Sequence, residues 1–203
     1  LPQRGISQAE ILYEIPAEGG VTRMMAFFTD ISDIASIGTV RSLRPYYAQC
    51  AFSYDAIIIH AGGSEAAYSL MSTTGWDHID GGRQTYAAAP FARDPDRIHN
   101  GLEHSLFADG AKLMDAIAER EFDLEHEGGE YDNGLIFSDD AVEQCTGDAE
   151  YACLTFNTYK SMSFDYNADD GLYYANQYGD KYIDENTGEQ VSYTNLIFLS
   201  TDI

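Results

Sequence analysis

The sequence predicts an α+β fold with two parts of different character. In residues 1–122, strand-like and helix-like segments alternate, which is typical of an α/β domain with a mixed sheet. In residues 136–203, short aromatic and β-branched segments are separated by turn sequences, which favours antiparallel strands. Residues 123–135 lie between these parts, are rich in acidic residues and contain Gly128-Gly129, as in a solvated linker or long loop.

The first predicted elements alternate between the two types. Val21–Phe28 is expected to be a strand, and Pro45 suits the first turn of a helix, where its missing N–H has no intrahelical partner. Apolar residues then recur at helical spacing: Tyr47, Cys50, Ala51 and Tyr54. The continuous apolar run Ala56–Ile59 predicts a strand buried on both faces.

Two more helices complete the expected first part. Gly62-Gly63 turns the chain, and Ser64 is a suitable N-cap for a helix over residues 65–73. The last helix, Asp109–Arg120, has an apolar face made of Leu113, Met114, Ile117 and Ala118.

The β-rich part is predicted from apolar segments and the turns between them. The expected strands are Tyr151–Phe156, Met162–Tyr166, Leu172–Tyr174 and Asn195–Leu199. Turn sequences occupy residues 167–171 and 185–188. The chain begins without Met and ends in or just after a predicted strand, so we expect a piece of a longer protein with an incomplete second part.

The charge of the chain excludes some partners. Among 203 residues, 34 Asp and Glu stand against 11 Lys and Arg, which gives a formal net charge of −23. Such a surface repels phosphates, so we expect no nucleic-acid partner and no binding to an anionic membrane surface. No apolar run is long enough to span a bilayer, so a membrane association would need a lipid anchor outside this chain.

Closely spaced arginines are unusual in so acidic a chain. Arg41 and Arg44 lie three residues apart, and Arg44 precedes Pro45 at a predicted helix start, where the helix dipole disfavours a cation. Together with Arg23, they could form a fork for a carboxylate or phosphate. Alternatively, they pair with carboxylates inside the fold, for example with Glu14 or Glu18.

The segment His60-Ala-Gly-Gly-Ser64 is a second candidate. Gly62 and Gly63 could let backbone N–H groups approach an anion at a helix start, although the segment matches no nucleotide-binding fingerprint. The simpler interpretation is a tight turn followed by an ordinary N-cap. Ser64 as a nucleophile, with His60 or His99 as its base, is a third and less favoured alternative.

No metal or cofactor is expected. The segment from His99 to His104 resembles the HxxEH zinc motif but is one residue too long, so its histidines would not align on a helix. Cys50 fits a small core residue. Cys145 and Cys153 flank an acidic loop and would form a disulfide only in an oxidising compartment, which leaves this pairing open.

Several spaced motifs resemble the YerB-like lipoproteins of Gram-positive bacteria. In the first part they are Gly5-Ile-Ser-Gln-Ala-Glu-Ile-Leu-Tyr-Glu14, Glu18-Gly-Gly-Val-Thr-Arg23, Ile37-Gly-Thr-Val-Arg-Ser-Leu-Arg-Pro-Tyr46 and His60-Ala-Gly-Gly-Ser64. In the second part they are Gly171-Leu-Tyr-Tyr174, Thr187-Gly-Glu-Gln190 and Asn195-Leu-Ile197. The resemblance implies an extracytoplasmic, lipid-anchored protein with two linked domains and implies no reaction. The family's usual opening strand and the end of its C-terminal domain are not in this sequence. We therefore expect either that the remainder exists beyond this chain or that it lies in a companion C-terminal fragment.

These observations lead to two functional hypotheses. The first is a cell-envelope lipoprotein that binds an anionic small molecule or an envelope component at Arg23, Arg41, Arg44 and the adjoining glycine turn. The second is an envelope hydrolase acting on an anionic or glycan substrate, with His60, His99 or a carboxylate in acid–base roles.

Overall fold

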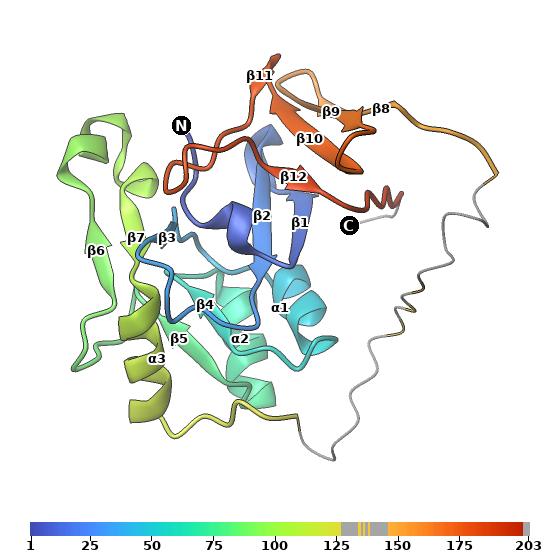
Figure 1. Cartoon of the computed structure of the whole chain (residues 1–203). Coiled ribbons are helices and arrows are strands. Elements are labelled where there is room, and N and C mark those ends of the chain that lie inside the picture. The colour runs from blue at the N-terminus through green and yellow to red at the C-terminus, as the bar shows by residue number, and fades with distance from the viewer. Residues whose placement is uncertain (127–133, 135, 137, 139–145, 201–203) are drawn as a thin grey trace.

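The structure is a computed structural model that describes residues 1–126, 134, 136, 138 and 146–200 (Figure 1). Helices and antiparallel strand pairs occur together, which confirms the α+β class. The helices found within the described ranges are all too short or too polar to cross a lipid bilayer.

The elements of the first part follow one another over residues 6–119. The strands are β1 (Ile11–Pro16), β2 (Thr22–Phe27), β3 (Ile37–Gly38), β4 (Ile58–His60), β5 (His78–Asp80), β6 (Phe91–Arg93) and β7 (Leu106–Ala108). The α-helices are α1 (Pro45–Phe52), α2 (Glu65–Thr74) and α3 (Gly110–Glu119). Short 3-10 helices are η1 (Ile6–Gln8), η2 (Glu18–Gly20), η3 (Pro95–Asn100) and η4 (Leu102–His104).

The second part is a twisted antiparallel sheet. Its strands are β8 (Tyr151–Asn157), β9 (Lys160–Asn167), β10 (Leu172–Gln177), β11 (Asp180–Lys181) and β12 (Ser192–Tyr193). The order is β11-β10-β9-β8, and β12 also pairs with β10. The predicted turns at residues 167–171 and 185–188 are confirmed.

Helix starts agree with the capping residues of the sequence. Pro45 is the first residue of α1. The Oγ of Ser64 accepts a hydrogen bond of 3.1 Å from the Ala67 N–H at the start of α2. Asp109 caps α3 in the same way through Lys112 N–H. Each cap satisfies a backbone donor that the helix itself leaves free, which explains the positions of these starts.

The first part contains several small sheets. Strands β4 and β5 are parallel and are connected by α2, whereas β3, β7 and β6 form an antiparallel sheet. In the β4–β5 pair, His60 lies opposite Asp80 at the carboxyl ends of both strands. The position of this pair matters for function, because ligand sites in parallel sheets form at those ends.

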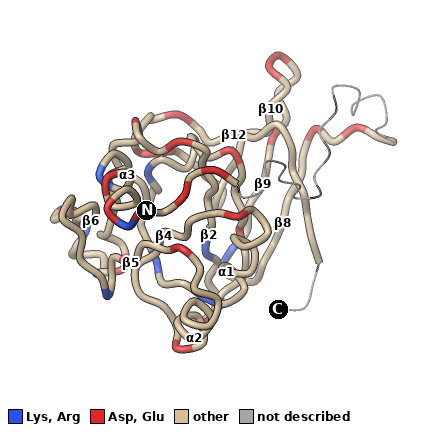
Figure 2. Tube along the Cα trace, turned by 90° about the horizontal axis from the view of Figure 1, so that it is seen from below, with Lys and Arg blue, Asp and Glu red and all other residues tan. Residues whose placement is uncertain are grey.

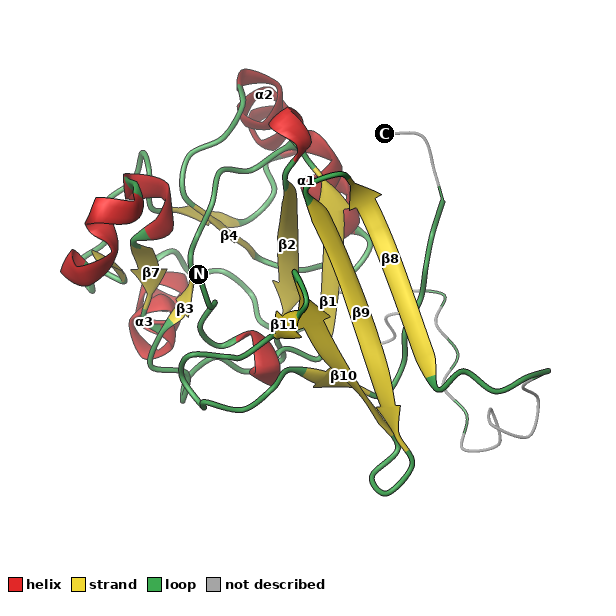
Figure 3. Cartoon of the chain, turned by 90° about the horizontal axis from the view of Figure 1, so that it is seen from above, coloured by secondary structure: helices red, strands yellow, loops and turns green. Residues whose placement is uncertain are grey.

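The hairpin β1–β2 lies between two hydrophobic cores (Figures 1 and 3). Met25 packs against the core of α1 and α2, which includes Tyr47 and Met71. Its neighbour Met24 packs against the core of the β-rich sheet, which includes Phe164. Successive side chains of a strand point to opposite faces, so one hairpin connects both cores.

Polar contacts add to this connection. Asp184 is fully buried and accepts hydrogen bonds from Gly5 N–H and from the N–H and Oγ–H of Ser7. Lys160 of β9 is buried against Glu14 of β1, with 2.8 Å between Nζ and Oε1. These contacts join the two parts of the chain, while the boundaries at residues 122 and 136 stay a prediction.

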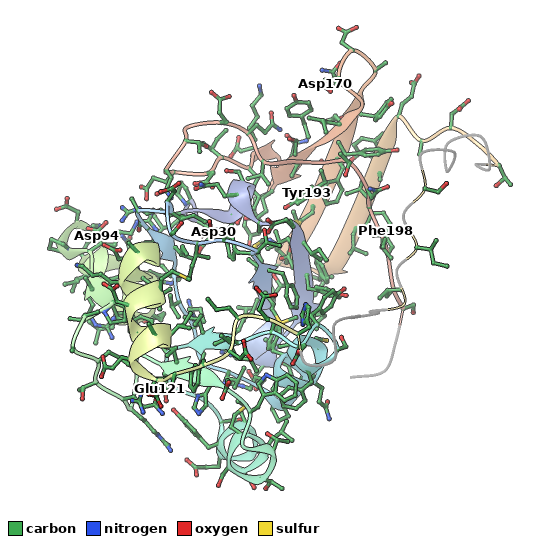
Figure 4. The ribbon with its side chains drawn as sticks, turned by 60° about the horizontal axis from the view of Figure 1, so that its bottom comes forward. Asp30, Asp94, Glu121, Asp170, Tyr193 and Phe198 are labelled. Atoms are coloured by element: carbon green, nitrogen blue, oxygen red, sulfur yellow. The ribbon has the colours of Figure 1, made fainter. Side chains whose placement is uncertain are left out.

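The strand predicted at Asn195–Leu199 is wrong, since this segment has no strand assignment. Leu196 packs against the core of the β-rich sheet, and the Phe198 ring lies 6.2 Å from that of Phe164 (Figure 4). Ile197 and Leu199 are 70% and 77% exposed. The segment is therefore a continuous apolar run in which Leu196 and Phe198 contact the core and Ile197 and Leu199 are exposed. It has no strand assignment because a strand needs a paired backbone, which an apolar pattern alone cannot supply.

Candidate functional site

The arginines singled out from the sequence come from two neighbouring segments. Arg23 lies in β2 opposite Ile15, and Arg41 and Arg44 flank Leu43 in the segment before α1. We call Arg23, Arg41 and Arg44 the arginine cluster. Figure 2 shows acidic positions on many of the described segments, with basic positions close to β2 and α1 and others near α3 and β6.

The arginine segment lies directly beside the glycine turn. Leu43 pairs in parallel with Gly63: Leu43 N–H donates to the Gly62 carbonyl (2.9 Å), and Ser64 N–H donates to the Leu43 carbonyl (3.1 Å). Ala61 N–H donates to the Arg41 carbonyl (3.0 Å). The backbone thus fixes where the side chains of Arg41 and Arg44 begin.

Arg44 is paired inside the fold. Its Nε donates to the Glu18 carboxylate, and its Nη1 donates to the Leu43 carbonyl (3.0 Å). The hydrogen bond from Arg44 lowers the pKa of Glu18. Internal pairing with Glu18, one of the two predicted alternatives, is therefore confirmed for Arg44. The negative charge of Glu18 offsets the unfavourable interaction between a cation and the dipole at a helix start.

Arg23 is only partly satisfied. Its side chain is 15% exposed, its Nη1 donates to the Ser42 carbonyl (2.8 Å), and its Nη2 lies 3.9 Å from Glu18 Oε2. Its Nε is buried and has no hydrogen-bond partner among the described residues. A buried donor without an acceptor is costly, by about 1–3 kcal/mol, so this nitrogen is a place where a ligand oxygen would be stabilised.

Arg41 has no carboxylate within 4.0 Å among the described residues. Its Nη1 donates to the backbone carbonyl of Glu103 (3.1 Å). Burial lowers the pKa of Arg41, the nearby charge of Arg23 lowers it further, and the charge of Glu103 partly opposes this shift. Within the part of the chain that the structure describes, Arg23 and Arg44 therefore share the carboxylate of Glu18, and Arg41 has no carboxylate within 4.0 Å.

A cavity of about 1220 Å³ adjoins the cluster. Arg23, Arg41, Ser42 and His60 line it, together with apolar side chains such as Met25 and Val40. Arg44, Gly62, Gly63, Ser64 and His99 do not line it. The lining also includes Lys160 and several carboxylates: Glu10, Glu14, Asp55, Asp77, Asp123 and Glu125. A large cavity lined mainly by apolar groups, with charged groups among them, is the usual form of a small-molecule site.

The glycine turn already holds an anion that belongs to the protein. Gly62 N–H and Gly82 N–H donate to Asp80 Oδ1 at 2.8 and 2.7 Å, and Tyr68 O–H donates to Oδ2 at 2.8 Å. Burial alone would raise the pKa of Asp80, but these hydrogen bonds lower it. The backbone of the turn therefore donates to the internal carboxylate of Asp80, and Ser64 caps helix α2.

His60 is buried and uses both of its ring nitrogens. Its Nδ1 lies 2.7 Å from the Gly62 carbonyl, and its Nε2 lies 2.9 Å from His78 Nδ1. Burial lowers the pKa of both histidines. His99 is exposed on η3 and contacts Asn100, so the structure does not bring it to the cluster.

His78 and Asp80 were missed by the sequence analysis. A usable signal was present, because a parallel strand–helix–strand unit places the residues that end both strands side by side. The segment His78-Ile-Asp80 follows α2 directly and ends beside His60. Cys145 lies outside the described residues, and so does the predicted disulfide with Cys153.

The fold and the cluster together define an α+β protein with an incompletely paired arginine group beside a large cavity. The model for the N-terminal domain of DUF3048, a family of proteins of unknown function, matches residues 1–123, and the model for its C-terminal domain matches residues 152–203. The chain therefore belongs to the DUF3048 family.

A relative and a solved structure agree with this assignment. The protein named "Putative lipoprotein YerB" of Bacillus subtilis (strain 168) is 25% identical to this chain over 205 residues. The match covers 98% of this chain and 57% of that protein. The crystal structure of the YerB protein from Bacillus subtilis has a TM-score of 0.74 and 23% identity, and covers 94% of this chain and 61% of that one. The chain thus spans less than two thirds of either protein's length.

Proposed function

We propose that this chain is part of an extracytoplasmic, lipid-anchored protein that binds an anionic ligand at Arg23 and Arg41. The observation that carries the binding proposal is the guanidinium of Arg41, which is half-buried beside Arg23 without a carboxylate partner among the described residues. A carboxylate or phosphate placed between the two side chains would relieve their repulsion and accept hydrogen bonds from both.

The cavity supports a small ligand with an apolar portion. The described lining combines the two arginines with Met25, Val40 and other apolar groups. Guanidinium groups hold carboxylate and phosphate in a fixed fork, which gives specificity in a chain whose net charge of −23 otherwise repels anions.

The location rests on similarity alone. The name of the Bacillus relative describes a lipoprotein, and this chain corresponds to 57% of its length. We infer an extracytoplasmic, lipid-anchored location for the protein that contains this chain. In that location, the ligand would be an anionic small molecule or a component of the cell envelope.

Binding is favoured over the hydrolase alternative. Both ring nitrogens of His60 already have partners inside the protein, and His99 lies away from the cavity lining. Neither histidine is placed to exchange a proton with a ligand that Arg41 holds.

Thermal unfolding with added anions tests the proposal. Citrate and inorganic phosphate, compared with chloride at equal ionic strength, are expected to raise the melting temperature of the wild type. A ligand at a hundred times its Kd adds about 2.7 kcal/mol of stability, which is about 5 °C or more for a chain of this size. Arg41→Gln should fold, because it loses one hydrogen bond to a carbonyl, and its Kd should rise about tenfold or more.

The matched control is Lys181→Gln, which removes one positive charge from the exposed strand β11. This variant should show the same rise in melting temperature with citrate and phosphate as the wild type. Equal stabilisation of Arg41→Gln and the wild type, or an Arg41→Gln variant that cannot fold, would contradict the proposal, because either result assigns Arg41 a structural role.

A further inference from the structure

A second, shallower cavity of about 530 Å³ lies at the end of α2 and β5. Its lining includes Trp76, His78, Arg83, Arg120 and Phe122. It adjoins the larger cavity at Trp76, which lines both, but it contains none of the arginine cluster. The group that distinguishes it is the imidazole of His78.

The hydrogen bonds behind His78 fix where its proton lies. A carbonyl oxygen can only accept, so the Gly62 carbonyl requires a proton on His60 Nδ1, 2.7 Å away. Burial favours the neutral form of His60, which leaves its Nε2 as an acceptor. That nitrogen lies 2.9 Å from His78 Nδ1, which must then donate. Burial lowers the pKa of His78 as well and so favours its neutral form, in which Nε2 carries a lone pair.

Every charged group near His78 is accounted for. Asp80 and Asp77 also line the cavity, and both oxygens of Asp80 are occupied by Gly62, Gly82 and Tyr68. Burial lowers the pKa of His78, the charges of His60 and Arg120 lower it further, and the charges of Asp80 and Asp77 raise it. The net direction favours the neutral form of His78, which can accept a hydrogen bond at the cavity.

Arg120 supplies the positive charge. Its guanidinium lies over the Tyr86 ring, 5.0 Å from the centroid, and no carboxylate among the described residues lies within 4.0 Å of it. Arg83 also lines the cavity, but it lies over Tyr68 at 3.5 Å and pairs with Glu65 at 3.2 Å. Arg120 is therefore the guanidinium available to a ligand.

We propose that this second cavity binds a hydroxylated anion of the sugar-acid type, whose hydroxyl donates to His78 Nε2 and whose anionic group contacts Arg120. The rings of Trp76 and Phe122 add an apolar surface suited to the C–H face of a sugar ring. A carboxylate and a phosphate share this chemistry, so uronic acids and sugar phosphates are both within the class. The site is distinct from the arginine cluster and does not depend on it.

Nitrogen NMR of the histidine rings tests the proton arrangement in the wild-type chain. His60 and His78 should both show protonated Nδ1 and unprotonated Nε2 near neutral pH. Added glucuronate or glucose 6-phosphate should shift the Nε2 signal of His78, with a Kd at least tenfold lower than that of glucose or acetate. The tighter of the two anions identifies the preferred acidic group.

Two variants distinguish binding at this cavity from a general effect of the chain's charge. Arg120→Gln should weaken glucuronate binding about tenfold and leave the ring protonation unchanged. The control Lys112→Gln removes a charge from an exposed position of the same helix and should bind as the wild type does. A proton on His78 Nε2, equal binding of glucose and glucuronate, or unchanged binding by Arg120→Gln would overturn the proposal.

Discussion

At the residue scale, the three arginines of the cluster have different surroundings. Arg44 is paired with Glu18, Arg23 shares that carboxylate at 3.9 Å, and Arg41 contacts a backbone carbonyl. The sequence shows the concentration of charge and names Glu18 as a partner. The sequence does not show which of the three arginines is paired, because the partner of each depends on the hairpin that brings residues 18 and 23 to the segment before α1.

Histidine environments set a pH dependence of stability. Burial lowers the pKa of His60 and His78 in the folded chain, whereas in the unfolded chain both take up protons near pH 6.5. The unfolded state therefore binds more protons as pH falls, so the stability that is present above about pH 6.5 is lost progressively below it. The loss is at most about 1.4 kcal/mol per pH unit for each histidine.

Urea unfolding between pH 7.5 and 5.5 measures this loss. His78→Gln should reduce the slope of unfolding free energy against pH, because it removes one of the two rings whose pKa is lowered in the folded chain. His99→Gln changes an exposed histidine and should leave the slope as it is in the wild type. A slope that His78→Gln does not reduce would contradict the neutral histidine pair.

At the scale of elements, local signals predict helices better than strands. The three α-helices begin at or next to the positions that Pro45, Ser64 and Asp109 indicate, since a cap is a local interaction. Short strands such as β3 and β5 exist because distant segments pair with them. For the same reason Asn195–Leu199 has a strand-like pattern and no strand: its apolar residues contact a core without a backbone partner.

The first segment of the chain depends on Asp184 for its position. This buried carboxylate accepts hydrogen bonds from Gly5, Ser7 and Asn186. Asp184→Ala leaves these donors without an acceptor and should cost about 3 kcal/mol or more of unfolding free energy, while Asp184→Asn should cost less because one oxygen remains. Urea unfolding gives the free energy, and faster amide exchange at Gly5 and Ser7 shows where the contact is lost.

Asp180→Ala is the matched control, because Asp180 lies at an exposed position of β11. A loss of stability for Asp184→Ala no greater than that for Asp180→Ala would show that the N-terminal segment does not need this carboxylate.

For the whole molecule, charge and geometry act at different ranges. The net charge of −23 disfavours polyanionic partners in general, whereas we propose that Arg23 and Arg41 bind one small anion at one place. The sequence alone indicates the first property. The second requires the fold, because Arg23 belongs to the hairpin and Arg41 to the segment that pairs with the glycine turn. The positions of His78 and Asp80 beside His60 also require the fold, because they result from the pairing of β4 with β5.

The most direct test is a crystal structure of this chain grown with citrate. The account predicts a carboxylate of citrate within about 2.7–3.2 Å of both Arg23 Nε and the guanidinium of Arg41, with Arg44 still paired to Glu18. An Arg41 side chain bonded to a carboxylate of the protein itself, with Arg23 Nε turned to an internal acceptor and citrate absent, would contradict it.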